Sequence, residues 1–260
     1  MRKVFSGVLR MLDSAERFAR TELLLGKRAL KKLSKARIAV FGLGAVGSFA
    51  VEALARSGVG AFFLVDFDQV RYSNFNRQLL ATESSLGMLK AESAACRISQ
   101  INPYCEVKVS AVFASLENLS SLFAWKPDIV IDAIDSLGPK SELISYCIRH
   151  NITIISSMGS GARTNPFSVR VGDISEVRAC PLARRLRKRL KKKGINKGVC
   201  CIYSLQQPVK NAGEQRQEKE FYERGRKRNP VGTLCYMSGI FGLTIAYEVI
   251  RRTVSSQLIT

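Results

Sequence analysis

The chain has 260 residues, of which 46% are hydrophobic, so it can bury a full core and is not a disordered polyelectrolyte. Its 41 Lys and Arg against 21 Asp and Glu give a formal net charge of +20, which favours a polyanion such as nucleic acid over its alternative, an anionic membrane surface. Seven scattered cysteines without a CxxC pair indicate free thiols in a reducing cytoplasm and offer no ligand set for zinc. Any metal is expected to be Mg²⁺ with a nucleotide.

Residues 1–36 are expected to form a helical segment, and charge interrupts them too often for a secretory leader. From Arg37 onward, short apolar runs alternate with helical patterns. The expected strands are 37–41, 61–66, 107–112, 128–133 and 152–156, and the expected helices include 45–57 and 87–101. Near-continuous apolar strands separated by helices predict an α/β fold: a doubly wound, Rossmann-like, mostly parallel sheet with helices on both faces.

The pattern changes after Ser157. The expected elements there are an edge strand over 169–171, a very basic helix over 182–193, a mobile surface loop over 210–230 and a closing helix over 235–252. The segment 231–247 is uncharged over 17 residues, which is the lower edge of a transmembrane length. We predict a buried core helix there and no transmembrane span.

A glycine-rich turn joins the first expected strand to its helix. In GLGAVG, Gly42, Gly44 and Gly47 allow a tight turn, close approach of the backbone to phosphate and close helix packing. The helix N-terminus offers N–H groups to an anion. Asp66 ends the second strand, where a carboxylate can bind both ribose hydroxyls. Strand, turn, helix and acid together predict a nucleotide site.

Two cations decide which nucleotide is expected. Arg77 lies in a polar segment without an apolar period, and Lys90 begins a helix, where a cation opposes the helix dipole. The polar donors that flank Arg77 are Asn74, Asn76 and Gln78. Cleavage between the α- and β-phosphates needs cations on the triphosphate and Mg²⁺ bridging its oxygens, whereas NAD chemistry needs neither. The sequence therefore favours ATP.

Two carboxylates stand at the carboxyl end of the expected strand 128–133. Asp132 and Asp135 occupy the position at which open α/β sheets bind ligands. One of the two is expected to hold the metal.

Several motifs together resemble the adenylating domain of the ThiF/MoeB and ubiquitin-activating-type superfamily: GLGAVG, the pair Asp66 and Asp68, SNFNRQ, GMLKAE and DAIDS. The resemblance implies that Arg77 and Lys90 bind the triphosphate. It also implies that Asp135 positions Mg²⁺ and is essential for adenylation.

The same resemblance implies the rest of a nucleotide pocket and a dimer. Asp66 would hold the ribose, Asn74 and Gln78 would line the pocket, and Asp68 is also predicted to bind the nucleotide. The RFAR segment near the N-terminus is similar to one that reaches a neighbouring subunit's ATP site in that superfamily. Arg20 would be the reaching arginine, and the chain would be a homodimer.

Within that superfamily, the motifs QINPYCEVKV, VIDAIDSLGPKSELISYC, ACPLARRLRKRL and GVCCIYS resemble the tRNA threonylcarbamoyladenosine dehydratase subgroup across nearly the whole chain. The resemblance implies that ATP activates the threonylcarbamoyl carboxylate on a tRNA adenosine, which then closes into a ring with loss of water. We divide the chain into a helical segment 1–36, an ATP-binding core 37–157 and a tRNA-binding region 158–260 of the same domain. Docking of a sulfur-transfer protein is left open.

The basic helix is the expected tRNA contact, with a solvated helix face as the alternative. It contains no acid that could neutralise its cations by pairing within the helix. Contacts of this kind are salt dependent and independent of base sequence. Charge reversal at Arg187, Arg189 and Lys192 is expected to weaken tRNA binding and spare ATP binding. The full set is Arg184, Arg185, Arg187, Lys188, Arg189, Lys191, Lys192 and Lys193.

Cysteine chemistry is the main mechanistic alternative. Cys201 resembles a cysteine position of the subgroup and is the candidate thiol. Ring closure needs no enzyme thiol, because its nucleophile is already held at high effective molarity. We expect Cys201→Ser to retain adenylation, and Cys200 and Cys235 to be structural.

Other functions are considered beside the preferred one. Activation of a ubiquitin-like sulfur carrier of the ThiS or MoaD type is the first alternative, and the missing zinc cysteines and the basic helix weigh against it. A non-catalytic nucleotide-binding RNA module and an NAD-dependent oxidoreductase follow. The only histidine, His150, is expected at the surface or at a helix end, which disfavours a Ser-His-Asp hydrolase.

Overall fold

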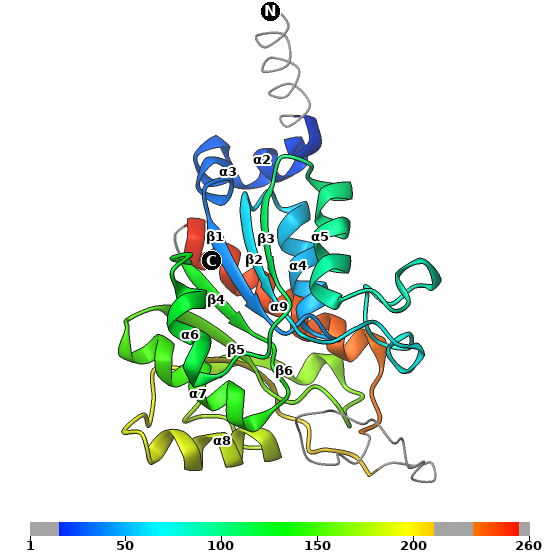
Figure 1. Cartoon of the computed structure of the whole chain (residues 1–260). Coiled ribbons are helices and arrows are strands. Elements are labelled where there is room, and N and C mark those ends of the chain that lie inside the picture. Colours follow the sequence, from blue (N-terminus) through cyan, green and yellow to red (C-terminus); the bar gives the residue numbers. More distant parts are fainter. Residues whose placement is uncertain (1–15, 211–230, 255–260) are drawn as a thin grey trace, which may run out of the picture.

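The computed structural model describes residues 16–210 and 231–254, and its centre is a seven-stranded sheet (Figure 1). The strand order is β3-β2-β1-β4-β5-β7-β6, in which β6 is antiparallel to β7 and all other neighbours are parallel. This confirms the predicted doubly wound, mostly parallel sheet. The strands are β1 (Arg37–Phe41), β2 (Ala61–Val65), β3 (Glu106–Ser110), β4 (Ile129–Asp132), β5 (Thr153–Ser157), β6 (Val169–Asp173) and β7 (Cys200–Ser204).

Helices cover both faces of the sheet. Alternate residues of each strand point to opposite faces, so Ile38 and Val40 of β1 join one core while Ala39 and Phe41 join the other. The first core is covered by α3 (Lys27–Leu33), α4 (Gly47–Arg56), α5 (Lys90–Ile101) and α9 (Cys235–Val254). The second is covered by α6 (Leu116–Phe123), α7 (Leu137–Arg149) and α8 (Pro181–Lys191). Burial on both faces explains why β1, β2 and β4 are continuous apolar runs.

The edge strand expected over 169–171 is β6, which does end the sheet. The sequence analysis did not predict α6 or β7, and of α7 it predicted only the end near His150. The two cysteines of β7 give little strand signal. Apart from Lys210, the loop expected over 210–230 lies outside the described residues. The sheet and the cores begun by the earlier strands are completed by β6, β7 and α9. The predicted division of the chain after residues 36 and 157 stays a prediction.

The closing helix α9 packs against α4, which confirms the predicted core helix. Gly242 makes this approach possible, because a Cβ there would lie 2.5 Å from the carbonyl oxygen of Val46. A larger residue would push the two helices apart. Within the described ranges, no helix is long and apolar enough to cross a membrane.

The N-terminal helices lie at the end of the sheet where β1 begins (Figure 1). α2 (Ala19–Leu25) leads into α3, and the ring of the preceding Phe18 packs beside Gly58, just ahead of β2. The Arg17 guanidinium donates a 2.9 Å hydrogen bond to the carbonyl of Ile101, the last residue of α5. The segment is thereby fixed to the edge opposite the glycine turn.

Candidate nucleotide and adenylation site

The glycine turn after β1 has the geometry that its residues predicted. Gly42 has φ +91°, and a Cβ there would lie 2.7 Å from the carbonyl oxygen of Ala133. At Gly47, the first residue of α4, a Cβ would lie 1.9 Å from the oxygen of Gly42. Gly44 is different, since its Cβ would meet only the Gln78 side chain, at 3.6 Å. Two glycines therefore build the turn, and the third keeps its surface open.

Asp66 is buried at the end of β2 and fastens this turn. Its two carboxylate oxygens accept hydrogen bonds from the amides of Leu43 at 2.6 Å and Asp68 at 2.9 Å. Burial raises the pKa of the Asp66 carboxyl, against the opposing charge of Lys90. Each oxygen keeps a further lone pair, so ribose hydroxyls can still donate to it. The residue predicted to bind ribose thus also shapes the phosphate loop.

Lys90 is buried although it carries a charge. Its Nζ lies 2.9 Å from a carboxylate oxygen of Asp68, and its amide donates to the carbonyl of the same residue. This carboxylate compensates for a cation at a helix N-terminus, which the sequence marked as unfavourable. Asp68, predicted to bind the nucleotide, is the residue that holds Lys90.

The polar segment of Arg77 lies against the glycine turn. The guanidinium of Arg77 donates to the carbonyl of Ser73 at 2.6 Å and to the side chain of Asn76 at 2.9 Å. Asn74 is buried and accepts from the Arg71 amide, so it shapes the segment and does not face outward. In the described part of the chain, nothing donates a hydrogen bond to the buried Oε1 of Gln78. An unpaired acceptor on a side chain that lies beside Gly44 fits a ligand with N–H or O–H donors.

The prediction that Asp132 or Asp135 holds the metal is narrowed to Asp135. Asp132 is fully buried, and its oxygens take Lys140 Nζ at 2.8 Å, the Ser156 hydroxyl at 2.6 Å and the Ile134 amide at 3.1 Å. Asp132 is closed off from solvent and its charge is already matched by Lys140, so it is not placed to take up a metal. Asp135 is exposed, in the loop that contacts Gly42, and stands at the carboxyl edge of the sheet.

Lys140 is a residue that sequence reasoning did not select. Besides the ion pair with Asp132, its Nζ donates to the carbonyl of Ile134 at 2.9 Å. The amide and the carbonyl of Ile134 are therefore both held by one buried ion pair, immediately before Asp135. The available signal was a lysine at helical spacing from the apolar residues Leu143 and Ile144. The pair fixes the backbone that presents Asp135.

A metal accompanying ATP fits these donors. Over residues 16–210 and 231–254, no three His, Cys, Asp or Glu side chains come together as a metal site. Mg²⁺ needs no such cluster, since it takes one or two carboxylates and completes its shell with phosphate oxygens and water. Asp135 would supply one carboxylate.

Cys201 is buried in the middle of the second core. Burial raises the pKa of its thiol well above the ordinary range, and Sγ contacts the carbonyl of Val199 at 3.4 Å. Burial also raises the pKa of Cys200 to about 11. Thiols of this kind stay protonated and unreactive near neutral pH. Cys235, expected to be structural, is exposed at the first residue of α9.

We expect Cys201→Ser to keep at least half of the wild-type rate of adenylation, measured as ATP–pyrophosphate exchange with acceptor present. A small cost in stability is expected, because a hydroxyl replaces a buried thiol. Cys96→Ser, at an exposed position, is the matched control. A folded Cys201→Ser protein without exchange activity would contradict the structural role assigned here.

The cations of the basic helix α8 fall into two groups: half-buried ones that are paired within the protein, and exposed ones. Arg187 donates to the backbone carbonyls of Ile174 and Val177, and Lys193, just beyond the helix, pairs with Glu142 at 2.5 Å. These two residues hold the helix to the body of the protein, so Arg187 is a poor choice for a charge-reversal test. The exposed members of the predicted set are Arg184, Arg185, Lys188, Arg189, Lys191 and Lys192.

Arg20 is not brought to this site. It is exposed on α2, at the amino end of the sheet, whereas the glycine turn and Asp135 lie at the carboxyl end. A five-residue strand separates the two edges by roughly 17 Å. Within one chain, Arg20 and the nucleotide site therefore lie at opposite ends of the strands.

The site so described is that of a nucleotide-binding α/β protein with cations and a carboxylate placed for phosphate chemistry. The chain matches the ThiF family over residues 18–258 and belongs to that family. This agrees with the predicted superfamily.

Named relatives and solved structures are similar over most of the chain. A tRNA threonylcarbamoyladenosine dehydratase of Bacillus subtilis is 38% identical, covering 90% of this chain and 92% of the relative. One of Escherichia coli is 42% identical over 74% of each chain. The crystal structure of E. coli TcdA in complex with ATP has a TM-score of 0.82 at 35% identity, covering 92% of this chain and 94% of that one. The complex with AMP has a TM-score of 0.83 at the same identity and coverage.

Proposed function

We propose that the protein catalyses ATP-dependent dehydration of threonylcarbamoyladenosine in tRNA, by adenylating the carboxylate of the modification. The observation that carries the proposal is the gathering of Asp66, Lys90 and Asp135 at one edge of the sheet, in a chain that aligns with dehydratases over most of its length. The net charge of +20 and the exposed cations of α8 suit a tRNA substrate.

The proposed reaction has two steps. The carboxylate of the modification attacks the α-phosphorus of ATP and pyrophosphate leaves, with Arg77 and Lys90 offsetting the charge of the phosphates. A nitrogen of the modification then attacks the activated carbonyl, AMP leaves, and a ring closes. The oxygen lost by the substrate leaves on AMP, so the nucleoside loses the elements of one water.

Three groups of the chain support the first step. Gln78 Oε1 and the carboxylate of Asp66 would bind the nucleoside part of ATP, and the amides of the glycine turn would receive phosphate. Asp135 would hold the Mg²⁺ that accompanies ATP, and the ion would supply positive charge that offsets the charge of the phosphates. The site of the reaction is expected to be the cytoplasm.

Mass spectrometry of nucleosides tests the function. tRNA bearing threonylcarbamoyladenosine is incubated with the protein, ATP and Mg²⁺, digested and analysed. The expected product is lighter by one water and appears only with ATP. An unchanged nucleoside beside active ATP–pyrophosphate exchange would instead assign the protein to another carboxylate, such as a protein C-terminus.

We also propose a homodimer in which Arg20 enters the partner's nucleotide site. Arg20 lies at the amino end of the strands, away from the nucleotide site of its own chain, and this position supports the arrangement. A row of exposed apolar side chains along α9 offers surface for such contact: Tyr236, Leu243 and Tyr247.

Mixing two inactive variants tests the shared site. Arg20→Ala and Lys90→Ala are each expected to lose most activity, and a mixture refolded together is expected to regain up to about a quarter of the wild-type rate. Mixed dimers hold one site with both residues intact, which is the reason for the recovery. Mixing Asp135→Ala with Lys90→Ala is the control, because both changes fall in one site contributed by the same chain. Equal recovery in the two mixtures would refute the exchange of Arg20.

A further inference from the structure

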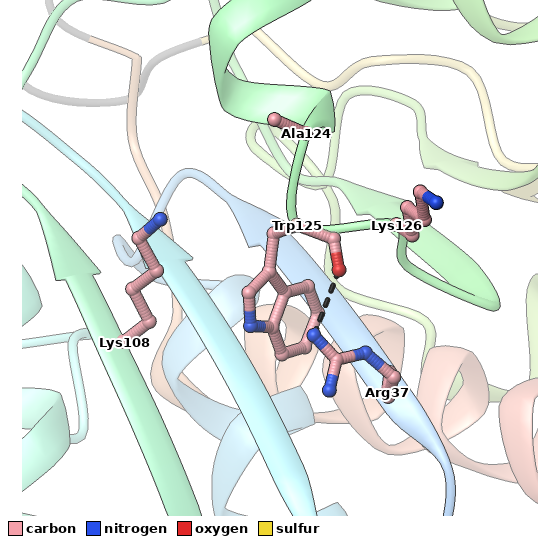
Figure 2. A pocket seen from close by; sticks show the side chains of 5 residues that line it. All are labelled: Arg37, Lys108, Ala124, Trp125 and Lys126. Carbon is pink, nitrogen blue, oxygen red and sulfur yellow. Dashed lines mark hydrogen bonds between the residues drawn. The ribbon is translucent and has the colours of Figure 1, made fainter.

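A basic hollow lies where β1 begins, at the end of the sheet opposite the glycine turn, on the face that carries α6, α7 and α8. Figure 2 shows the residues that line it. Its volume is about 600 Å³. Arg37 comes from the start of β1, Lys108 from β3, and the remaining three residues from the connection between α6 and β4. The lining residues are Arg37, Lys108, Ala124, Trp125 and Lys126.

An aromatic ring and a cation form the floor of the hollow. The guanidinium carbon of Arg37 lies 4.1 Å from the ring centroid of Trp125, and its Nη2 donates to the Trp125 carbonyl at 2.7 Å, drawn as a dashed line in Figure 2. The stacking fixes the guanidinium in place. Glu106 lies 3.9 Å from Arg37 at an exposed position, and Asp128 accepts a hydrogen bond from the Arg37 amide.

Two lysines complete the hollow. Lys108 Nζ lies 5.1 Å from the ring of Phe63, and Lys126 is exposed with φ +53°, a conformation that few non-glycine residues adopt. Neither lysine has a carboxylate within ion-pair distance in the described part of the protein. The positive charge of the hollow is therefore incompletely balanced.

The indole of Trp125 carries an unused donor. Trp125 is 8% exposed, and among residues 16–210 and 231–254 nothing accepts a hydrogen bond from its Nε1. Figure 2 shows this nitrogen on the side of the ring that faces Lys108. The Lys108 side chain is flexible, so it can move as an oxygen approaches this side of the ring. A buried N–H without acceptor is uncommon and points to a missing acceptor.

We infer that this hollow binds phosphate of the tRNA backbone, as a second contact beside α8. The inference rests on the proposed function. Three cations, an aromatic ring and a free N–H donor fit a phosphate and the adjoining sugar or base. The hollow and α8 lie on the same face of the sheet. One tRNA can therefore contact both while its modified adenosine lies in the nucleotide site, at the carboxyl end of the strands.

Charge reversal tests the contact. Lys108→Glu combined with Lys126→Glu is expected to weaken tRNA binding at least tenfold and to reduce the slope of log Kd against log salt by roughly 1.5, as for two lost phosphate contacts. Lys27→Glu with Lys31→Glu is the control, because both residues are exposed on α3, on the opposite face, and the net charge changes equally. ATP affinity should stay unchanged in both variants. An equal loss in both pairs would reduce the effect to net charge and overturn the inference.

Fluorescence gives a direct readout, because Trp125 is the only tryptophan of the chain. Adding tRNA to the wild-type protein is expected to shorten the fluorescence lifetime of Trp125, and ATP alone is expected to leave it unchanged. Inorganic phosphate at millimolar concentration is added in a separate experiment. A change in the Trp125 lifetime would indicate a site for free anions, and an unchanged lifetime would indicate a contact that needs RNA. If the protein converts tRNA normally while the lifetime stays constant, the inference fails and the proposed function stands. If the wild-type protein neither binds nor converts the tRNA, the proposed function itself is refuted.

Discussion

Asp135→Ala is expected to lower the rate of nucleoside dehydration by at least about 100-fold, the order of effect of removing one electrostatic group from a reaction centre. Asp135 is exposed at the carboxyl end of the sheet, in the loop that contacts Gly42, and it is the carboxylate proposed to hold the metal that accompanies ATP. Initial rates by nucleoside mass spectrometry measure the effect, with tRNA binding followed in parallel and expected to stay normal.

Asp135→Asn refines this test, since it keeps the size of the side chain and removes its charge. Glu117→Ala, at an exposed carboxylate of α6, controls for the loss of a surface charge and should be fully active. Normal turnover by Asp135→Ala would show that other groups bind the metal or offset the charge of the phosphates.

Lys140→Met is expected to lower the free energy of unfolding by about 3–5 kcal/mol, because the carboxylate of Asp132 would stay buried without its cation. Urea denaturation measures the change. The double variant Asp132→Asn with Lys140→Met should recover at least half of the loss, since no unpaired charge remains. A Lys140→Met protein as stable as the wild type would contradict the stabilising role of this ion pair.

The double variant also separates folding from positioning. Even with stability restored, Ile134 has lost the ammonium that bonded its carbonyl, so Asp135 is held less firmly. We therefore expect activity to stay reduced in this variant.

Sequence reasoning predicted the β1, β2, β4 and β5 strands because each contains a short run of apolar or β-branched residues that is buried on both faces. The glycine turn and Asp66 were predictable for a related reason: their spacing follows from the geometry of one βαβ unit. The edge strand β6 followed from its position after the pattern changed.

Other features depend on partners that sequence spacing does not reveal. Asp132 and Asp135 look alike in the sequence, and only the packing of α7 brings Lys140 to the first of them. Arg187 is indistinguishable from its basic neighbours until the carbonyls of Ile174 and Val177 lie beneath it. Cys201 could not be assigned as buried because β7 is short and was not recognised.

The placement of β1 between β2 and β4 has a consequence for synthesis on the ribosome. The register pairs Ile38 with Ile129, so one side of β1 has no partner strand until about ninety further residues have been made. Until then, a hydrophobic strand edge is open to pairing with other nascent chains. The glycine turn also lacks the loop of Ala133, against which Gly42 is packed. We therefore expect ribosome-bound chains shorter than about 140 residues to need a chaperone and to have no competence for ATP, and both properties should change together as β4 joins the sheet.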